Sequence, residues 1–430
     1  MRLMNTEYNS GNLPQSENSS LQPSATVGES DEKVYSIPGH TLEFEEDFER
    51  NIDIFIKEPS NGVNENTGYF LILHPGTASA DSWYYQRLRE EWSDRYNVVA
   101  IGVNYLGTIN RTFYYTARPK WTKECLDTLY SLLSWEQQSE LTGSGRYDVD
   151  TMCNMLPNYN ATKLLKLPEE IQHRERTDYR DYGYIQTMDC LYAIKHAMNL
   201  CDEKKLITNK NRVFVYGNCF GGHLAQICAK FAPSTFCLVV DNSGFVEMTK
   251  HFLDTVPING VYKHKSGFAC TLVREPYYSD DPKSKYFLHR DMIDIRNMTI
   301  PRHLKVFSEY FKGKIIMFHG ENDNTIKIKS RIRMHELYDS AGIDNYLRVF
   351  TEKDIDGQII KSSGHGMDAD IKLLFEKYCD KYVLENSETA VVKDVPSDYE
   401  RESIIKYPGL IFYYLIDYTD NFPAIHFIKL

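Results

Sequence analysis

The residues Gly217-Asn218-Cys219-Phe220-Gly221 have the types and spacing of a nucleophile held at a tight turn. An apolar run, 213–216, precedes them, and a segment with apolar residues at helical spacing, 223–231, follows. This is the glycine–x–nucleophile–x–glycine pattern of a strand–turn–helix elbow, with cysteine where serine is usual. We predict that Cys219 is a nucleophile, because the N-terminus of the following helix favours a thiolate. The alternative is a structural cysteine in a glycine-rich turn.

The two glycines of this stretch suit such a turn. Gly217 and Gly221 are needed because a side chain at either position would collide with neighbouring backbone. A free thiol has a pKa of about 8.5 and is only slightly ionised at neutral pH. A nearby base is therefore expected to accompany the nucleophile.

A carboxylate suited to orient such a base follows another apolar run. Asp323 comes after the run 314–318, at a turn before the helical segment 329–341. The chain order nucleophile, acid, histidine places the acid at such a turn. We therefore predict that Asp323 is the acid, with Glu321 and Asp354 as alternatives. An ordinary helix-capping role for Asp323 is the plain structural alternative.

The histidine of such a set is expected on a loop after the last core strand. His365 lies between Gly364 and Gly366, after the apolar run 346–350 and before the helical segment 369–384. The flanking glycines would let the imidazole reach over the edge of the sheet. We predict that His365 is the general base. Three further histidines could take this role instead: His74, His223 and His319.

Acyl-transfer chemistry also needs two fixed hydrogen-bond donors for the oxyanion. One is expected to be the backbone N–H of Phe220, directly after the nucleophile. The other is expected from the loop His74-Pro75-Gly76-Thr77, which follows the apolar run 69–73. Because proline has no N–H, we predict that this donor is Gly76 or Thr77.

Strands and helices alternate along the part of the chain that carries these residues. Short apolar runs predict buried parallel strands, and they lie at 69–73, 98–103, 213–216, 236–240, 314–318 and 346–350. Helical patterns separate several of them, at 184–200, 223–231, 329–341 and 369–384. The alternation predicts an α/β fold with a mostly parallel central sheet and helices on both faces, which with the elbow is the α/β-hydrolase fold.

Further segments extend this unit. We predict antiparallel lead-in strands between Val34 and Lys57 and a hydrolase domain over 33–390. The additions are a flexible tail over 1–32, two lid insertions at about 105–180 and 245–310, and a C-terminal β-hairpin over 391–430 that could join the lead-in strands. Insertions after strand C-termini overhang the ligand crevice of an open α/β sheet.

The composition excludes several classes of function. A net charge of −11 disfavours binding to nucleic acid. No apolar run is long enough to span a bilayer, and the N-terminal residues do not have the pattern of a signal peptide. Nine cysteines without a C-x-x-C pair indicate reduced thiols and a cytoplasmic location. No metal or cofactor motif stands out, since the pair His335-Glu336 lacks the second histidine of H-E-x-x-H.

Beyond the general fold, one stretch suggests a more specific relationship. The segment 178–189 before the elbow, the segment 221–233 after it and Val239-Val-Asp-Asn-Ser-Gly244 resemble an uncharacterised bacterial α/β-hydrolase-like family. The resemblance covers about 65–385 and implies a link to surface or flagellar glycosylation. That family is in turn similar to accessory proteins of glycoprotein export that carry a sugar O-acetylation site. It implies Cys219, Asp323 and His365 as the triad, although most such proteins have serine as the nucleophile.

These observations leave three hypotheses. The first is an esterase or deacylase that works through a thioester acyl-enzyme on Cys219. The second is an O-acyltransferase that moves an acyl group, from a donor such as acyl-CoA, to a glycan or a small molecule. The third is a non-catalytic accessory protein that binds a glycan or protein partner. The presence of Cys219, Asp323 and His365 in the expected order argues against the third hypothesis.

Overall fold

The computed structural model divides the chain into two compact units. The structure describes residues 31–41, 49–108, 119–145, 147–168, 182–248, 260–273, 278–279, 281–284, 286–392 and 394–429. Of these, the smaller unit holds the residues within Tyr114–Tyr179 and Lys250–Ser284, and the larger unit holds the rest. The predicted tail, 1–32, lies almost entirely outside the described residues.

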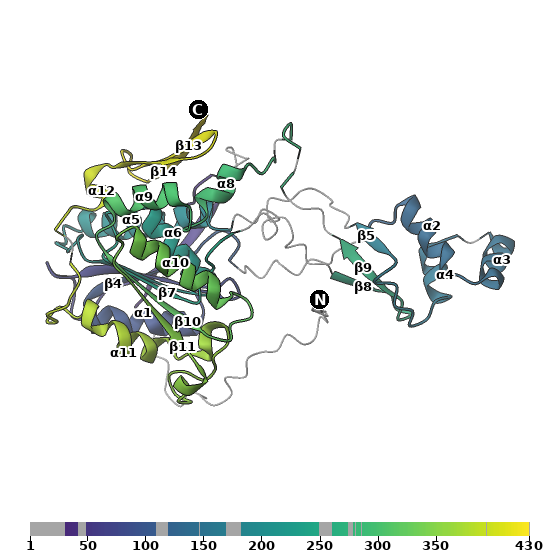
Figure 1. The fold of residues 1–430 in the computed structure, drawn as a ribbon, viewed down its shortest axis with the longest axis horizontal. Coiled ribbons are helices and arrows are strands. Elements are labelled where there is room, and N and C mark those ends of the chain that lie inside the picture. The colour runs from purple at the N-terminus through teal and green to yellow at the C-terminus, as the bar shows by residue number, and fades with distance from the viewer. Residues whose placement is uncertain are drawn as a thin grey trace. The chain divides into compact units, whose positions relative to one another are not determined.

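The larger unit is built on an eight-stranded sheet with the order β1-β2-β4-β3-β6-β7-β10-β11 (Figure 1). Strand β2 pairs antiparallel with both β1 and β4, and the remaining pairs are parallel. The strands are β1 (Lys33–Pro38), β2 (Asn51–Lys57), β3 (Gly68–Leu73), β4 (Val98–Asn104), β6 (Val213–Asn218), β7 (Leu238–Asn242), β10 (Lys314–Gly320) and β11 (Asn345–Phe350). This is the α/β-hydrolase fold, and it confirms the predicted class.

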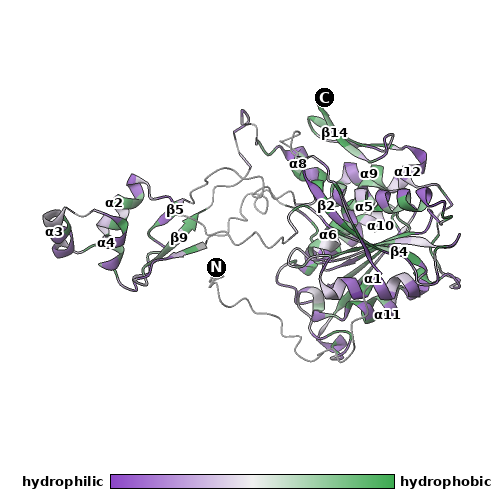
Figure 2. Cartoon of the chain, turned by 180° about the vertical axis from the view of Figure 1, so that it is seen from behind, coloured by the Kyte–Doolittle hydropathy of each residue, from purple (hydrophilic) through white to green (hydrophobic). Residues whose placement is uncertain are grey.

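Helices cover both faces of this sheet. Helices α1 (Trp83–Arg95) and α11 (Ile371–Val383) lie below it in Figure 1, and α5 (Tyr184–Glu203), α6 (Phe220–Phe231) and α10 (Ile328–Ser340) lie above it. On the lower face Trp92 stacks on Phe70 and contacts Phe375, with ring centroids 4.9 and 4.6 Å apart. Because both faces of the inner strands β3, β4, β6, β7 and β10 are buried, these strands are nearly continuous apolar runs, and the middle of the sheet is mostly green in Figure 2.

The C-terminal extension is a sheet of three strands rather than the predicted hairpin. The strands are β12 (Ile404–Pro408), β13 (Phe412–Asp417) and β14 (Ala424–Lys429), all antiparallel, and they form a sheet separate from the central one. The extension therefore has one strand more than predicted and does not join the lead-in strands. The carboxylate of Asp291, on α8 (Arg290–Ile295), accepts the N–H groups of 410–412. This capped turn starts β13 beside α8, away from the lead-in strands.

The smaller unit has strands and a core of its own. Its sheet has the order β5-β9-β8, with β5 (Lys166–Pro168), β8 (Gly260–Lys263) and β9 (Ala269–Val273). The helices α2 (Lys123–Ser131), α3 (Trp135–Ser144) and α4 (Val149–Asn154) pack with it around Leu129, Leu141 and Phe268. The insertions are shorter than predicted, because residues 105–108, α8 and α9 (Pro301–Tyr310) belong to the larger unit. That the insertions act as lids stays a prediction.

Three short helical segments complete the larger unit: α12 (Asp398–Arg401) before the C-terminal sheet, and the 3-10 turns η2 (Glu352–Asp354) and η3 (His365–Asp368) after β11. Among the helices that the structure describes, none combines the length and the apolar character needed to cross a bilayer.

Candidate active site

The nucleophile elbow lies between β6 and α6. Cys219 has φ +53° and ψ −117°, an unusual conformation for a residue with a side chain. A Cβ atom at Gly217 would lie 2.0 Å from the carbonyl oxygen of Gly221, and one at Gly221 would lie 2.5 Å from that of Leu73. Both positions therefore exclude any side chain, for the reason that the sequence indicated. The backbone N–H of Cys219 donates to the carbonyl oxygen of Asn242 over 2.8 Å.

The structure brings the three predicted triad residues into one hydrogen-bonded chain. The Nε2 atom of His365 lies 3.0 Å from the sulfur of Cys219, and its Nδ1 atom lies 2.8 Å from Oδ2 of Asp323. Cys219 and Asp323 follow β6 and β10, and His365 lies on the loop after β11; the carboxyl ends of these parallel strands lie at the same edge of the sheet. The distances are those of a nucleophile, a base and the group that orients the base.

The acid turn and the histidine loop are held against each other. The N–H of Asn322 donates to the carbonyl oxygen of Ser363 over 2.9 Å, and its side chain donates to the Ser363 hydroxyl over 3.0 Å. A Cβ atom at Gly320 would lie 2.3 Å from that same carbonyl oxygen. The close approach of the two segments fixes Asp323 relative to His365.

The electrostatics of this chain favour a charged imidazole. Burial raises the pKa of Asp323, but hydrogen bonds from His365 and from the Ile326 N–H outweigh it and hold that pKa below its usual value. Burial by itself lowers the pKa of His365, yet its hydrogen bonds to Asp323 and Cys219 raise it to about 10. A histidine with this pKa holds a proton at neutral pH.

The predicted oxyanion donors lie close to the nucleophile. A Cβ atom built on Gly76 would lie 3.7 Å from the Cβ atom of Phe220, so the loop after β3 packs against the start of α6. Within the described part of the chain, the N–H groups of Gly76, Thr77 and Phe220 donate to no other residue. They are therefore available to a ligand oxygen.

His74 supports this loop instead of acting as a base. Its side chain is fully buried, and Nδ1 contacts the carbonyl oxygen of Pro75 at 2.8 Å. Its ring stacks on Tyr105 at 4.4 Å, and the Tyr105 hydroxyl donates to the His74 carbonyl oxygen over 2.8 Å. Burial lowers the pKa of His74 to about 4, so the ring is neutral. The sequence analysis missed Tyr105, although its place directly after β4 puts it at the same edge of the sheet.

Two more histidines that the sequence offered as bases, His223 and His319, are bound to backbone carbonyl groups. His223 is buried with Nδ1 on the Phe245 carbonyl oxygen, and burial lowers its pKa to about 4. His319 contacts the carbonyl oxygen of Ile326 and lies 3.6 Å from Asp323, and burial also lowers its pKa to about 4. Both rings are therefore neutral structural groups, and His365 is the histidine that contacts the sulfur of Cys219.

The carboxylates of Asp354 and Glu321, which the sequence left open as acids, serve elsewhere. Asp354 accepts hydrogen bonds from Arg348 and Thr351 on the loop after β11. Glu321 is exposed. Asp323 is the carboxylate that contacts Nδ1 of the imidazole.

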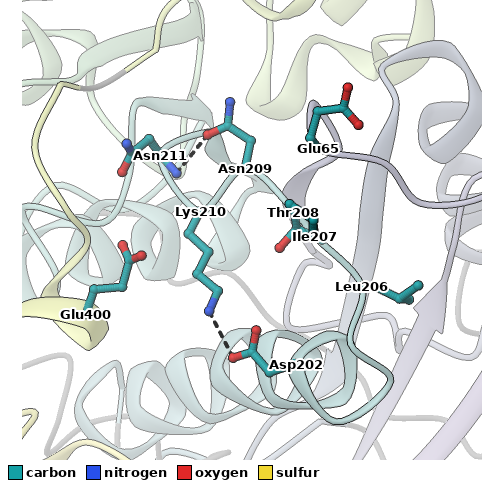
Figure 3. A pocket seen from close by; sticks show the side chains of 9 residues that line it. All are labelled: Glu65, Asp202, Leu206, Ile207, Thr208, Asn209, Lys210, Asn211 and Glu400. Carbon is teal, nitrogen blue, oxygen red and sulfur yellow. Dashed lines mark hydrogen bonds and ion pairs between the residues drawn. The ribbon is translucent and has the colours of Figure 1, made fainter.

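A polar hollow of about 480 Å³ lies elsewhere on the larger unit (Figure 3). Its wall includes the loop 206–211, which precedes β6, whereas Cys219 follows β6. Lys210 and Asp202 in its wall form an ion pair of 2.9 Å. The hollow therefore lies at the edge of the sheet opposite the triad and takes no part in this site.

No group of three or more His, Cys, Asp or Glu side chains that could hold a metal ion occurs in the described ranges. All nine cysteines are free, and Cys219 is partly exposed whereas the other eight are buried. Cys219 is thus the thiol that a soluble reagent or substrate can reach.

A protein-family model described as "Protein of unknown function (DUF2920)" matches residues 64–422. Curated proteins give no match to the sequence. Among solved structures, the chain is similar to Est1E from Butyrivibrio proteoclasticus with ferulic acid bound, at 10% identity and a TM-score of 0.38, covering 76% of this chain and 92% of that one.

Two peptidases are also similar. An acylaminoacyl peptidase from Pyrococcus horikoshii has 10% identity and a TM-score of 0.41, with 83% of this chain and 43% of that chain covered. A puromycin-hydrolyzing peptidase from Mycobacterium tuberculosis has 12% identity and a TM-score of 0.38, with 74% and 36% covered. The chain thus spans less than half the length of either peptidase. The fold assignment rests on the strand order and the elbow of this chain itself.

Proposed function

The chain belongs to the family described as "Protein of unknown function (DUF2920)", and we propose that it is an acyl-transfer enzyme of the esterase type. Cys219 is the nucleophile, His365 carries the proton and Asp323 orients the histidine. The observation that supports this proposal is the continuous hydrogen-bonded chain, 2.8 Å from Asp323 to His365 and 3.0 Å from His365 to Cys219.

In the proposed resting site His365 carries a proton and faces the sulfur of Cys219 at 3.0 Å, because its hydrogen bonds to Asp323 and Cys219 raise its pKa to about 10. The thiolate attacks the carbonyl carbon of an ester or thioester, and a C–S bond forms while the carbonyl oxygen becomes an oxyanion. The N–H groups of Phe220 and of Gly76 or Thr77 stabilise this oxyanion. When the bond to the leaving group breaks, the leaving oxygen or sulfur takes the proton from Nε2 of His365.

The thioester on Cys219 is then resolved by an acceptor hydroxyl. Neutral His365 removes the proton of water or of an alcohol as its oxygen attacks the thioester carbon, and the thiolate leaves. Water as acceptor makes the protein an esterase or deacylase. A sugar hydroxyl as acceptor, with a donor such as acyl-CoA, makes it an O-acyltransferase. The glycan acceptor is proposed from the family resemblance to proteins linked to surface glycosylation.

The proposal is tested by intact mass after mixing the protein with p-nitrophenyl acetate or with acetyl-CoA. An adduct of one acetyl group is expected on the parent and on Cys125→Ala, and none on Cys219→Ala. Cys125 is a suitable control because it is a buried cysteine of the smaller unit. Faster loss of the adduct when sugars are added indicates transfer, and loss at one rate indicates hydrolysis. The absence of any adduct from acetyl or longer acyl donors would refute the proposed enzymatic activity and favour the hypothesis of a non-catalytic accessory protein.

A further inference from the structure

The turn Asp241–Gly244, which begins in the last two residues of β7, contacts both halves of the candidate site. Its sequence Asp-Asn-Ser-Gly is part of the stretch that resembles the bacterial family, but it has no role in the proposed chemistry. The carbonyl oxygen of Asn242 accepts the N–H of Cys219 over 2.8 Å. The hydroxyl of Ser243, the next residue, accepts the N–H of Gly366 over 3.2 Å. One short turn therefore holds the residue that carries the sulfur and the peptide that follows the base.

The histidine loop needs such support. Three consecutive residues after His365 have left-handed backbone, namely Gly366 at φ +69°, Met367 at φ +56° and Asp368 at φ +43°. Two of them are not glycine, and left-handed conformations of such residues persist only where the surroundings hold them. The side chain of Met367 is fully buried, and its carbonyl oxygen accepts the N–H groups of 361 and 362. At the His365 end of this run, the support is the Ser243 hydroxyl.

The turn is itself rigid because buried charges brace it. Oδ1 of Asp241 accepts the N–H of Gly244 over 2.7 Å, and Oδ2 lies 2.5 Å from Nη1 of Arg331. The Nη2 atom of Arg331 donates to the carbonyl oxygen of Gly244. The side chains of Asp241 and Arg331 are completely buried, so this ion pair is not exposed to water or to screening by salt.

The turn also fits tightly against the helix that begins at the nucleophile. A Cβ atom at Gly244 would lie 2.6 Å from the carbonyl carbon of Gly222, and one at Gly222 would lie 2.5 Å from Oδ1 of Asp241. Ser243 has φ +55°, a conformation that points its hydroxyl to the histidine loop and that serine adopts rarely. Its own N–H donates to the carbonyl oxygen of Phe318 on β10.

We propose that Ser243 is a positioning residue for the reaction, and this inference rests on the proposed function. Its hydroxyl fixes the peptide after His365, while the neighbouring Asn242 carbonyl fixes Cys219. The braced turn therefore sets the distance between the imidazole and the sulfur.

The test is the pH dependence of the rate at which iodoacetamide alkylates Cys219, measured by mass spectrometry of the intact protein. Only Cys219 is partly exposed among the nine cysteines, so the signal is specific. The parent is expected to be alkylated faster at pH 6 than an ordinary thiol, because His365 lies 3.0 Å from the sulfur. In Ser243→Ala and Ser243→Gly, the profile is expected to move toward the value of about 8.5 of an ordinary thiol, with a roughly 10-fold loss of rate at pH 6.

The two variants separate the hydroxyl from the backbone, because glycine adopts φ +55° without strain whereas alanine does not. The Gly variant is therefore expected to fold even if the Ala variant does not. Ser362→Ala is the matched control, since it removes a hydroxyl that accepts the Gly364 N–H on the other side of His365. The control is expected to keep the parental profile.

A parental profile in Ser243→Gly would overturn the inference, and so would an equal shift in Ser362→Ala. The outcome is separate from that of the acyl-enzyme test. If the parent forms no acyl adduct but its alkylation at low pH depends on Ser243, the positioning role is supported and the proposed acyl-transfer reaction is refuted. If the parent is acylated and the variants are alkylated at the same rate as the parent, the acyl-transfer reaction is supported and the positioning role is refuted.

Discussion

Replacing Asp323 by asparagine is expected to lower the proton affinity of His365 while keeping the shape of the site. The two side chains have the same size, and Oδ1 can still accept the N–H groups of Thr325 and Ile326, now at 2.8 and 2.9 Å. What is lost is the negative charge beside Nδ1 of His365, at 2.8 Å. The proton is then no longer favoured on the imidazole.

The size of the effect follows from the pKa of His365. That pKa lies at about 10, against an ordinary value of 6.5, and the hydrogen bond to Asp323 is the largest of the contributions that raise it. At about 1.4 kcal/mol per pKa unit, the site favours the protonated ring by on the order of 5 kcal/mol. If Asp323 supplies about half, its loss lowers the pKa of the imidazole by roughly 2 units, and the equilibrium constant for proton transfer from the Cys219 thiol to the ring falls by roughly 100-fold.

The assay is the rate of Cys219 alkylation by iodoacetamide between pH 5 and pH 9, together with the rate of acetylation by p-nitrophenyl acetate. Asp323→Asn is expected to lose about two orders of magnitude in the first rate at pH 6 and a similar factor in the second. Near pH 9 its alkylation is expected to approach that of the parent, because an ordinary thiol ionises there.

Asp354→Asn is the matched control, since Asp354 is a second carboxylate that the sequence allows as the acid and lies on the loop after β11. Its carboxylate binds Arg348 and Thr351 and does not contact the histidine. Its profile is expected to match that of the parent. An unchanged profile in Asp323→Asn, or an equal loss in Asp354→Asn, would refute the assignment of the acid.

Two further predictions concern the elbow and the C-terminal sheet. Gly221→Ala is expected to cost about 1–3 kcal/mol of stability and to abolish the acyl adduct, because its Cβ would lie 2.5 Å from the Leu73 carbonyl oxygen. In the control Gly143→Ala, where no atom lies within 4 Å of the added Cβ, calorimetry should show no loss of stability and intact mass no loss of the adduct. Asp291→Ala is expected to cost about 1–3 kcal/mol by leaving the N–H groups of 410–412 without their acceptor, seen as faster hydrogen exchange there. Although burial raises the pKa of Asp291, these hydrogen bonds hold the pKa below its usual value. The contribution of Asp291 to stability is therefore complete above about pH 4 and is lost as the pH falls through the lowered pKa. Protection of 410–412 from hydrogen exchange that persists in Asp291→Ala would contradict this.

The central sheet could be predicted because its information is local. Each inner strand is a nearly continuous apolar run, since both of its faces are buried, and each run ends where polar or glycine residues begin. The elbow could be predicted for the same reason. Gly217 and Gly221 stand four residues apart because contacts within and directly beside that turn exclude any side chain.

The smaller unit and the C-terminal sheet could not be predicted in detail from local patterns. Strand β9 is short and pairs with β5, which lies about a hundred residues earlier in the chain, and the short strand β8 pairs with β9. The start of β13 depends on Asp291, which is 119 residues away from Leu410. Such elements are stabilised by long-range contacts that leave no period in the sequence.

The sequence by itself determined where along the chain the core strands lie and which cysteine, aspartate and histidine would lie at one edge of the sheet. Only the tertiary structure decided how those three side chains are held at hydrogen-bonding distance. The sequence allowed His74 as a base, but its contact with Tyr105 makes it a buried support of the loop. The positioning role proposed for Ser243 likewise depends on its contact with Gly366, far away in the chain. The physical reason is that a strand forms from the burial of its own residues, whereas the geometry of the site comes from hydrogen bonds between loops that only folding brings together.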